Sequence, residues 1–164
     1  MYIRIGQGLD THQLQLNTPL ILGGVTIPYE KGSKGHSDGD VLYHAVVDAI
    51  FGAMSLGDIG THFPSHEQKW KNADSSHFLK HAFDLIVRKK LHIINLDSTI
   101  LLQEPHISKY IPEMKSNISK ILKMEISNIS VKATTTDHLG FVGNSKGITA
   151  HAIVLIGKLD ERKG

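Results

Sequence analysis

The sequence has 164 residues, a formal net charge of +2, eleven histidines and no cysteine. This length suits one domain, which we expect over residues 1–160, with a frayed tail over 161–164. The weak net charge argues against the strongly basic surface of a nucleic-acid-binding protein. Without cysteine, disulfides and thiolate-bound metals are excluded, so histidines and carboxylates are the strong metal ligands that remain.

Neither a signal sequence nor a membrane span is expected. The first residues, Met1 to Ile5, contain no apolar segment behind a charged leader. No apolar run approaches the roughly 20 residues that cross a bilayer. We therefore expect a protein of the bacterial cytoplasm with no membrane partner.

The N-terminal part of the chain predicts a strand and a hairpin. Apolar residues alternate with polar ones over residues 3–5, which predicts a strand that ends by presenting Asp10 and His12. Two glycines then separate the apolar residues 20–22 from the apolar residues 25–27. This pattern predicts a tight hairpin, which we expect to be peripheral.

Two amphipathic helices are predicted next. Ser37 or Asp38 is the expected N-cap of the first helix, whose apolar stripe extends over 41–53 and which should end near 56–57. The second helix is expected to begin around 74–76, and basic residues at its end suit the helix dipole.

The C-terminal half predicts three strands and a third helix. The strands are expected over 94–102, 129–133 and 148–156, and Pro112 suits the first turn of the helix between the first two. Strands that alternate with helices indicate an α+β sandwich, in which a mixed, mainly four-stranded sheet has helices on one face and a small peripheral hairpin beside it.

Both faces of the expected last strand, 148–156, are largely apolar. The helices can cover only one of these faces. A second copy of the same sheet is the simplest cover for the other face, and closed symmetric oligomers are the usual result.

Three side chains from two segments form a candidate metal site. Asp10 and His12 are two residues apart on the expected strand, so they point to the same side. His44 shares one helix face with Asp40 and Asp48. One carboxylate and two imidazoles with an open position are typical of catalytic zinc. Taken singly, the same residues also fit a capping aspartate, an ordinary histidine and a solvated helix face.

Three loops have both a structural and a functional interpretation. Gly57-Asp58-Ile59-Gly60 can end the first helix, or its carboxylate can bind substrate hydroxyls. Thr134-Thr135-Thr136-Asp137 can cap a helix. It can also hold a phosphate with its cation, because magnesium prefers one or two carboxylates together with phosphate oxygens. Residues 139–144 fit either a flexible hinge or a plain loop.

Five motifs, taken in order, give the chain a resemblance to a known family. They are Gly8-Leu9-Asp10-Thr11-His12, His36-Ser37-Asp38-Gly39-Asp40 through His44, Gly57-Asp58-Ile59-Gly60, Phe63-Pro64, and Lys132-Ala133-Thr134-Thr135-Thr136. Over nearly its whole length the chain resembles the 2-C-methyl-D-erythritol 2,4-cyclodiphosphate synthase family.

The resemblance implies a phosphorus-oxygen lyase of the non-mevalonate isoprenoid pathway. In that reaction the 2-phosphate of 4-diphosphocytidyl-2-C-methyl-D-erythritol 2-phosphate attacks the β-phosphate of the same molecule, and CMP is released. The resemblance also implies a homotrimer with its active sites between subunits, and its sheets packed around the trimer axis.

Roles for single residues follow from the same resemblance. Asp10, His12 and His44 would bind one zinc ion per subunit, and Asp137 would bind the magnesium or manganese ion on the substrate diphosphate. The implied catalytic residues are His36 and Thr135. The implied substrate-binding residues are Ser37, Asp58, Ile59, Gly60, Phe63, Leu102, His106, Ile107, Ala133, Thr134, Thr136, Asp137 and Phe141.

Several positions depart from the family pattern, among them Ser65-His66-Glu67, which replaces a more acidic stretch after Phe63-Pro64. Asp137 stands where glutamate is common, and His106 stands where lysine is frequent. Asn144 replaces a usual arginine and His151 a usual glutamate. In the family these last two positions lie beside a central cavity that takes isoprenoid diphosphates.

Two other functions fit the same residues. A zinc phosphohydrolase would use the same ions to activate water. A non-catalytic trimeric module would store zinc or bind a nucleotide without turnover. The reaction products separate the three functions, since only the synthase yields CMP together with a cyclic product.

Overall fold

The computed structural model describes residues 2–158, and one mixed sheet in it has the strand order β4-β1-β7-β5-β6. Its strands are β1 (Tyr2–Leu16), β4 (Lys31–Lys34), β5 (His92–Leu101), β6 (Ile129–Thr134) and β7 (Gly147–Lys158). Strands β5 and β6 are parallel, and the other neighbours are antiparallel. The predicted α+β fold is confirmed, but the sheet has five strands rather than four.

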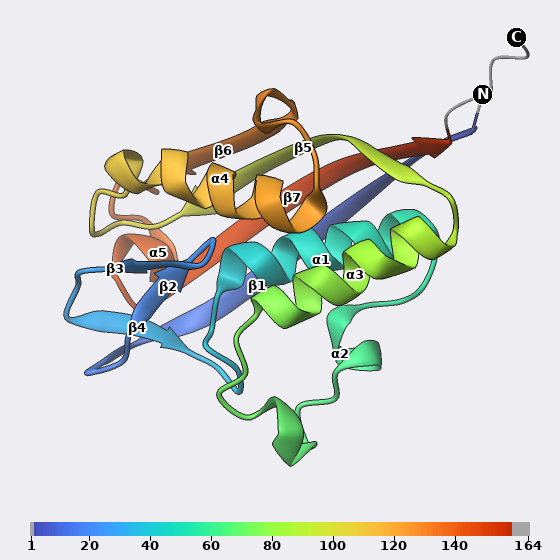
Figure 1. The fold of residues 1–164 in the computed structure, drawn as a ribbon. Coiled ribbons are helices and arrows are strands. Elements are labelled where there is room, and N and C mark those ends of the chain that lie inside the picture. Colours follow the sequence, from blue (N-terminus) through green and yellow to red (C-terminus); the bar gives the residue numbers. More distant parts are fainter. Residues whose placement is uncertain (1, 159–164) are drawn as a thin grey trace, which may run out of the picture.

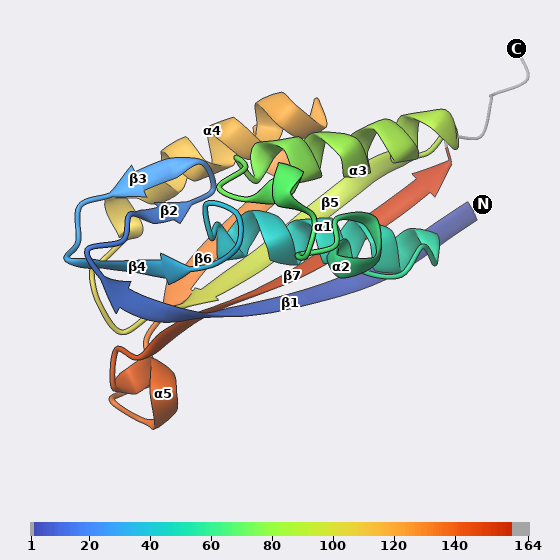
Figure 2. The same cartoon turned by 90° about the horizontal axis from the view of Figure 1, so that it is seen from below.

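The long helices cover one face of this sheet, as predicted. Figures 1 and 2 show α1 (Val41–Met54), α3 (Ser76–Arg88) and α4 (Ile111–Leu122) on the same side of the strands. Pro112 lies in the first turn of α4. The shorter helical segments are α2 (Ile59–His62), α5 (Gly140–Gly143), η1 (Gln68–Trp70), η2 (Ser108–Tyr110) and η3 (Ile126–Asn128).

The predicted first strand is too short. Strand β1 continues past Asp10 and His12, and its last residues, 13–16, pair with β4. The sequence of β4 is Lys-Gly-Ser-Lys, which contains no β-branched or aromatic residue and therefore carries no local strand signal. Pairing with β1, rather than local propensity, makes this segment a strand.

The predicted hairpin is confirmed as β2 (Leu20–Leu22) and β3 (Val25–Ile27), which form a separate two-stranded sheet. The φ angles of Gly23 and Gly24 are +57° and +70°, which glycine adopts without strain. The hairpin is less peripheral than predicted, because three of its apolar side chains are at most 2% exposed: Leu20, Leu22 and Ile27.

Asp40, rather than Ser37 or Asp38, is the N-cap of α1. Its carboxylate accepts hydrogen bonds of 2.8–3.1 Å from two amides in the first turn of the helix and from both hairpin glycines. Burial raises the pKa of Asp40 to about 6, although these backbone hydrogen bonds oppose the shift. The side chain thus connects the hairpin to the helix that carries His44.

The other predicted elements begin and end within two residues of their expected positions. Residues 140–143 form a helical turn instead of a hinge or an irregular loop. Within residues 2–158, no helix is both long and apolar enough to cross a membrane. The predicted tail, 161–164, lies outside the described residues.

Candidate metal centre and active-site cleft

Strand β1 and helix α1 bring the three predicted metal ligands together. Asp10 Oδ2 lies 2.8 Å from His12 Nε2 and 2.9 Å from His44 Nδ1. The two imidazole nitrogens are 3.3 Å apart. All three side chains are partly or largely buried, and their ligand atoms lie within 4.8 Å of one another. The residues predicted from two distant segments therefore form one cluster.

Two glycines allow the helix and the strand to approach this closely. A Cβ atom on Gly6 would lie 1.9 Å from the carbonyl oxygen of Ala49 on α1. A Cβ atom on Gly8 would lie 1.9 Å from the carbonyl oxygen of Ala45. Both distances are far below van der Waals contact, so only glycine permits this packing. No local sequence pattern indicates this contact, which sets the separation of His44 from Asp10.

Both imidazoles are oriented by hydrogen bonds from the nitrogen that faces away from the cluster. His12 Nδ1 lies 2.8 Å from the carbonyl oxygen of Lys34, which can only accept, so this nitrogen donates and directs Nε2 toward Asp10. His44 Nε2 lies 2.9 Å from Ser75 Oγ and 3.1 Å from Ser37 Oγ. Such outer contacts are typical of histidines that bind metal.

Asp10 and His12 each shift the pKa of the other. Burial raises the pKa of Asp10, but the hydrogen bonds and charges of His12 and His44 outweigh it and hold this pKa well below its ordinary value. Burial lowers the pKa of His12, but its contacts with Asp10 and Lys34 produce a net increase. A metal ion competes with protons for these nitrogens, so its binding releases protons.

The donor atoms fit a divalent transition metal. One carboxylate oxygen and two imidazole nitrogens are borderline ligands that suit zinc, and three protein ligands leave a coordination position for another group. That position can face the adjacent cleft, because all three residues line it.

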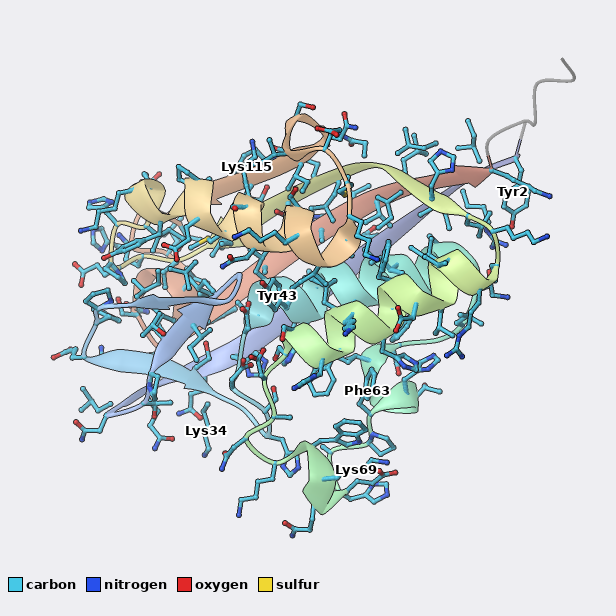
Figure 3. All side chains as sticks on the ribbon, viewed as in Figure 1. Tyr2, Lys34, Tyr43, Phe63, Lys69 and Lys115 are labelled. Carbon is cyan, nitrogen blue, oxygen red and sulfur yellow. The ribbon has the colours of Figure 1, made fainter. Side chains whose placement is uncertain are left out.

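The cleft beside the cluster is a cavity of about 650 Å³. Several residues predicted for the site line it together with the three ligands: His36, Ser37, Ile59, Gly60 and Phe63. Phe63 and Lys69, both labelled in Figure 3, lie on the segment that joins α2 to α3. The aromatic rings of Phe63, Trp70 and Phe78 contact one another with centroid separations of 4.6–5.6 Å and form an apolar wall.

Asp58 is beside the cleft but its carboxylate has a structural partner. Its Oδ1 accepts hydrogen bonds of 2.8 Å from the amide and the hydroxyl of Thr61, and it thereby caps α2. These bonds lower the pKa of Asp58. Asp48, one turn after His44, accepts a 2.7 Å hydrogen bond from the Ile59 amide and so connects α1 to α2. A role of Asp58 toward substrate hydroxyls stays a prediction.

Most of the other predicted residues lie in a second group, at or just after the ends of the parallel strands β5 and β6, and Phe141 lies on α5. Their loops are adjacent, since the Leu102 amide donates a 3.0 Å hydrogen bond to the Thr134 carbonyl. Leu102 and Ile107 are buried, whereas Asp137 is exposed and Phe141 is 51% exposed. None of this group, which also includes His106, Ala133, Thr135 and Thr136, lines the cavity described above.

Several residues that contact the ligand cluster or line the cleft have no counterpart in the sequence predictions. Ser75 was expected only at a helix start, yet its hydroxyl contacts His44. Trp70, Phe78, Thr61 and His66 line the cavity. Trp70 is the only tryptophan of the chain, which is a weak signal. The contacts of the others depend on how α3 and the segment before it pack, and local sequence patterns do not encode that packing.

The fold and the site define an α+β protein with a candidate metal centre beside a cleft. Comparison with known families matches residues 3–157 to the YgbB family, so the chain belongs to this family. A 2-C-methyl-D-erythritol 2,4-cyclodiphosphate synthase from Clostridium kluyveri is 54% identical over 154 residues, which are 94% of each chain.

Solved structures show the same fold. The chain matches the bifunctional IspDF of Campylobacter jejuni with a TM-score of 0.92 and 42% identity, over 96% of this chain and 43% of that longer one. It matches a CDP complex of IspF from Plasmodium falciparum with a TM-score of 0.86 and 39% identity, over 97% of this chain and 98% of that one.

Proposed function

We propose that the chain is a 2-C-methyl-D-erythritol 2,4-cyclodiphosphate synthase, a lyase of the non-mevalonate isoprenoid pathway. Its relative from Clostridium kluyveri has this name, and the matching Plasmodium falciparum structure is a CDP complex. The observation that carries the proposal is the convergence of Asp10, His12 and His44 at the wall of a cleft.

The proposed reaction is an intramolecular phosphoryl transfer. An oxygen of the 2-phosphate forms a bond to the β-phosphorus of 4-diphosphocytidyl-2-C-methyl-D-erythritol 2-phosphate. The bond from that phosphorus to the oxygen it shares with the α-phosphate breaks, and CMP leaves with the electron pair. The nucleophile is already ionised at neutral pH, so catalysis consists mainly of alignment and the offsetting of charge repulsion.

Cations are needed because the two reacting groups are both anions. At about 4 Å, two unit charges interact by roughly 4 kcal/mol at an effective dielectric constant near 20. Asp10, His12 and His44 would hold zinc, and Asp137 would hold magnesium or manganese through its exposed carboxylate. When bound, these ions supply Lewis-acid stabilisation of the phosphate charge and a template for the substrate.

The chain's own polar groups would orient the phosphates and the sugar. His36 and Ser37 line the cleft next to the metal ligands, where an imidazole N–H and a hydroxyl can donate to phosphate oxygens. Ile59 and Gly60, which precede Phe63 in the chain, line the same cleft and would face the methylerythritol. The apolar wall of aromatic rings would exclude water and so disfavour hydrolysis.

The second group of residues would complete the site from a neighbouring subunit. Thr134, Thr135 and Asp137 would contact the diphosphate, and the loop from Leu102 to Ile107 would contact the cytosine. Within one chain these residues do not line the cleft that holds the metal ligands. A homotrimer with its active sites between subunits would unite the two groups.

The exposed face of the sheet supports this assembly. Figure 2 shows the long helices on one side of β1 and β7 only. On the opposite side, Ile5 is 69% exposed, Leu9 58% and Ile153 37%. His151 points to the same side, and its Nε2 is buried without a hydrogen-bond partner among the described residues. Contacts between copies around a closed axis would bury this apolar surface.

The direct test is incubation with the cytidine diphosphate substrate, zinc and magnesium, followed by phosphorus NMR. We expect the signals of CMP and of a cyclic diphosphate to appear together. Release of inorganic phosphate would instead indicate a phosphohydrolase. Binding of metal and CMP without turnover would indicate a non-catalytic module and would contradict the proposal.

A complementation experiment tests the shared site. His44→Ala inactivates the metal-binding half, and Thr135→Ala inactivates the other half. Refolding the two variants together should restore about a quarter of the active sites, because random mixing places both intact halves in one site with that frequency. If mixed oligomers form but activity does not return, each active site belongs to a single chain.

A further inference from the structure

Helix α3 begins in an unusual way for a serine-capped helix. Ser75 is the N-cap residue and is fully buried, yet its hydroxyl makes no capping hydrogen bond to the helix. A serine at this position normally caps an amide of the first turn. The hydroxyl is instead directed toward the metal-ligand cluster.

Ser75 Oγ lies between a carboxylate and an imidazole. It contacts Asp38 Oδ1 on one side and lies 2.9 Å from His44 Nε2 on the other. A carboxylate can only accept, so the serine proton is donated to Asp38. Toward His44, Ser75 Oγ can then only accept, which favours a proton on Nε2; Ser37 Oγ, 3.1 Å from the same nitrogen, can accept from it as well.

Asp38 is itself held firmly. Its Oδ2 accepts a 3.0 Å hydrogen bond from the Ser75 amide, and its Oδ1 accepts one of 3.2 Å from the Asp40 amide. The Asp38 amide donates a 3.0 Å hydrogen bond to the Ala73 carbonyl. These bonds connect the start of α3 to the loop before α1. They give a defined geometry to the hydrogen-bond relay that extends from Asp38 through Ser75 to His44.

We propose that Asp38 and Ser75 are positioning residues that hold His44 in the tautomer protonated on Nε2, so that Nδ1 presents its lone pair to a metal ion. Nδ1 is the nitrogen that lies 2.9 Å from Asp10 Oδ2, inside the ligand cluster. The opposite tautomer would direct an N–H at the metal and prevent ligation. This inference rests on the metal site of the proposed function.

Asp38→Asn tests the relay with little change in shape. An amide has one acceptor oxygen, whereas Asp38 uses both carboxylate oxygens. In one orientation the new NH₂ group faces the Ser75 amide. In the other it faces the Asp40 amide and donates to Ser75 Oγ, whose proton can then turn toward His44 and favour the wrong tautomer. We expect a loss of zinc affinity of about 10–100-fold, the range for such outer contacts.

The experiment is a zinc titration of the purified protein in competition with a chelating dye. Asp74→Asn is the matched control, since it changes the same charge one residue before Ser75. Asp74 is exposed, and its Oδ1 accepts a 2.8 Å hydrogen bond from the Ser76 amide that an asparagine can retain. We expect the control to bind zinc like the wild type.

Nitrogen NMR of the zinc-loaded wild type provides a second measurement that does not depend on a variant. We expect His44 to carry its proton on Nε2 when Nδ1, the nitrogen that faces Asp10, binds zinc. A proton on Nδ1, or a folded Asp38→Asn variant with zinc affinity within twofold of the wild type, would overturn the inference while leaving the proposed function intact. A wild type that binds no zinc would overturn the proposed function and this inference with it.

Discussion

The contact between β1 and α1 leads to a prediction about Gly8. A Cβ atom at this position would lie 1.9 Å from the Ala45 carbonyl oxygen and 2.6 Å from the Ala49 amide nitrogen. Both are backbone atoms of the helix, so no side chain can move aside to make room. Gly8→Ala therefore requires that α1 and β1 separate.

The size of the required shift follows from these distances. Ordinary contact begins at 3.4 Å, so the 1.9 Å contact is short by about 1.5 Å, and the packed elements must absorb that difference. Overpacking of this kind costs about 1–3 kcal/mol or more. The shift also moves His44 away from Asp10, and metal–ligand distances tolerate changes of only about 0.2 Å.

We expect Gly8→Ala to lower the melting temperature by several degrees, since each kcal/mol corresponds to about 2–4 °C for a chain of this size. We also expect zinc affinity to fall at least about tenfold, because the loss of a hydrogen-bond partner of a metal ligand alone costs that much. Thermal unfolding followed by circular dichroism and a zinc titration measure the two effects.

Gly52→Ala is the matched control. Gly52 lies on the exposed side of α1, and a Cβ there would meet its nearest atom, the Gln7 carbonyl oxygen, at an ordinary 3.5 Å. Alanine favours a helix interior over glycine by about 1 kcal/mol, so this variant should be more stable and bind zinc normally. A Gly8→Ala protein with wild-type stability and zinc affinity would refute the packing argument.

Three further predictions concern the site and its support. His44→Ala should retain the fold but lose bound zinc and turnover, as metal analysis and the CMP assay would show; full turnover by the zinc-free variant would contradict this. The pKa of Asp40 is raised from 3.8 to about 6 in the folded chain, so the folded state binds the extra proton and this residue's contribution to stability declines as pH rises between these values. The unfolding free energy of the wild type relative to Asp40→Asn should therefore fall by on the order of 3 kcal/mol across that window, and an unchanged difference in denaturant titrations would count against it. Removal of zinc by a chelator should lower the melting temperature, since an ion at a thousandfold excess over its Kd stabilises the folded state by about 4 kcal/mol; calorimetry that shows no shift would mean that no ion bridges β1 and α1.

Local patterns predicted much of this protein correctly. The spacing of Asp10 and His12 on a strand and the helix face that His44 shares with Asp40 and Asp48 were enough to select the three side chains of one candidate metal cluster, because side-chain direction in regular structure follows from sequence spacing. The paired glycines placed the hairpin, and Pro112 placed the start of α4. These signals are short-range and depend on backbone conformations that single residues restrict.

Other features depend on contacts between distant segments, and only the tertiary structure shows them. Residues 31–34 form a strand because β1 is beside them, although their own composition does not favour one. Ser75 has the sequence signal of a helix cap, but its hydroxyl contacts His44 because the start of α3 packs against the loop before α1. Gly8 matters because a helix carbonyl occupies the space a side chain would need. Periodicity and propensity carry no information about which elements will meet, so the ligand types could be found from the sequence, whereas their distances and supporting hydrogen bonds are set by long-range packing.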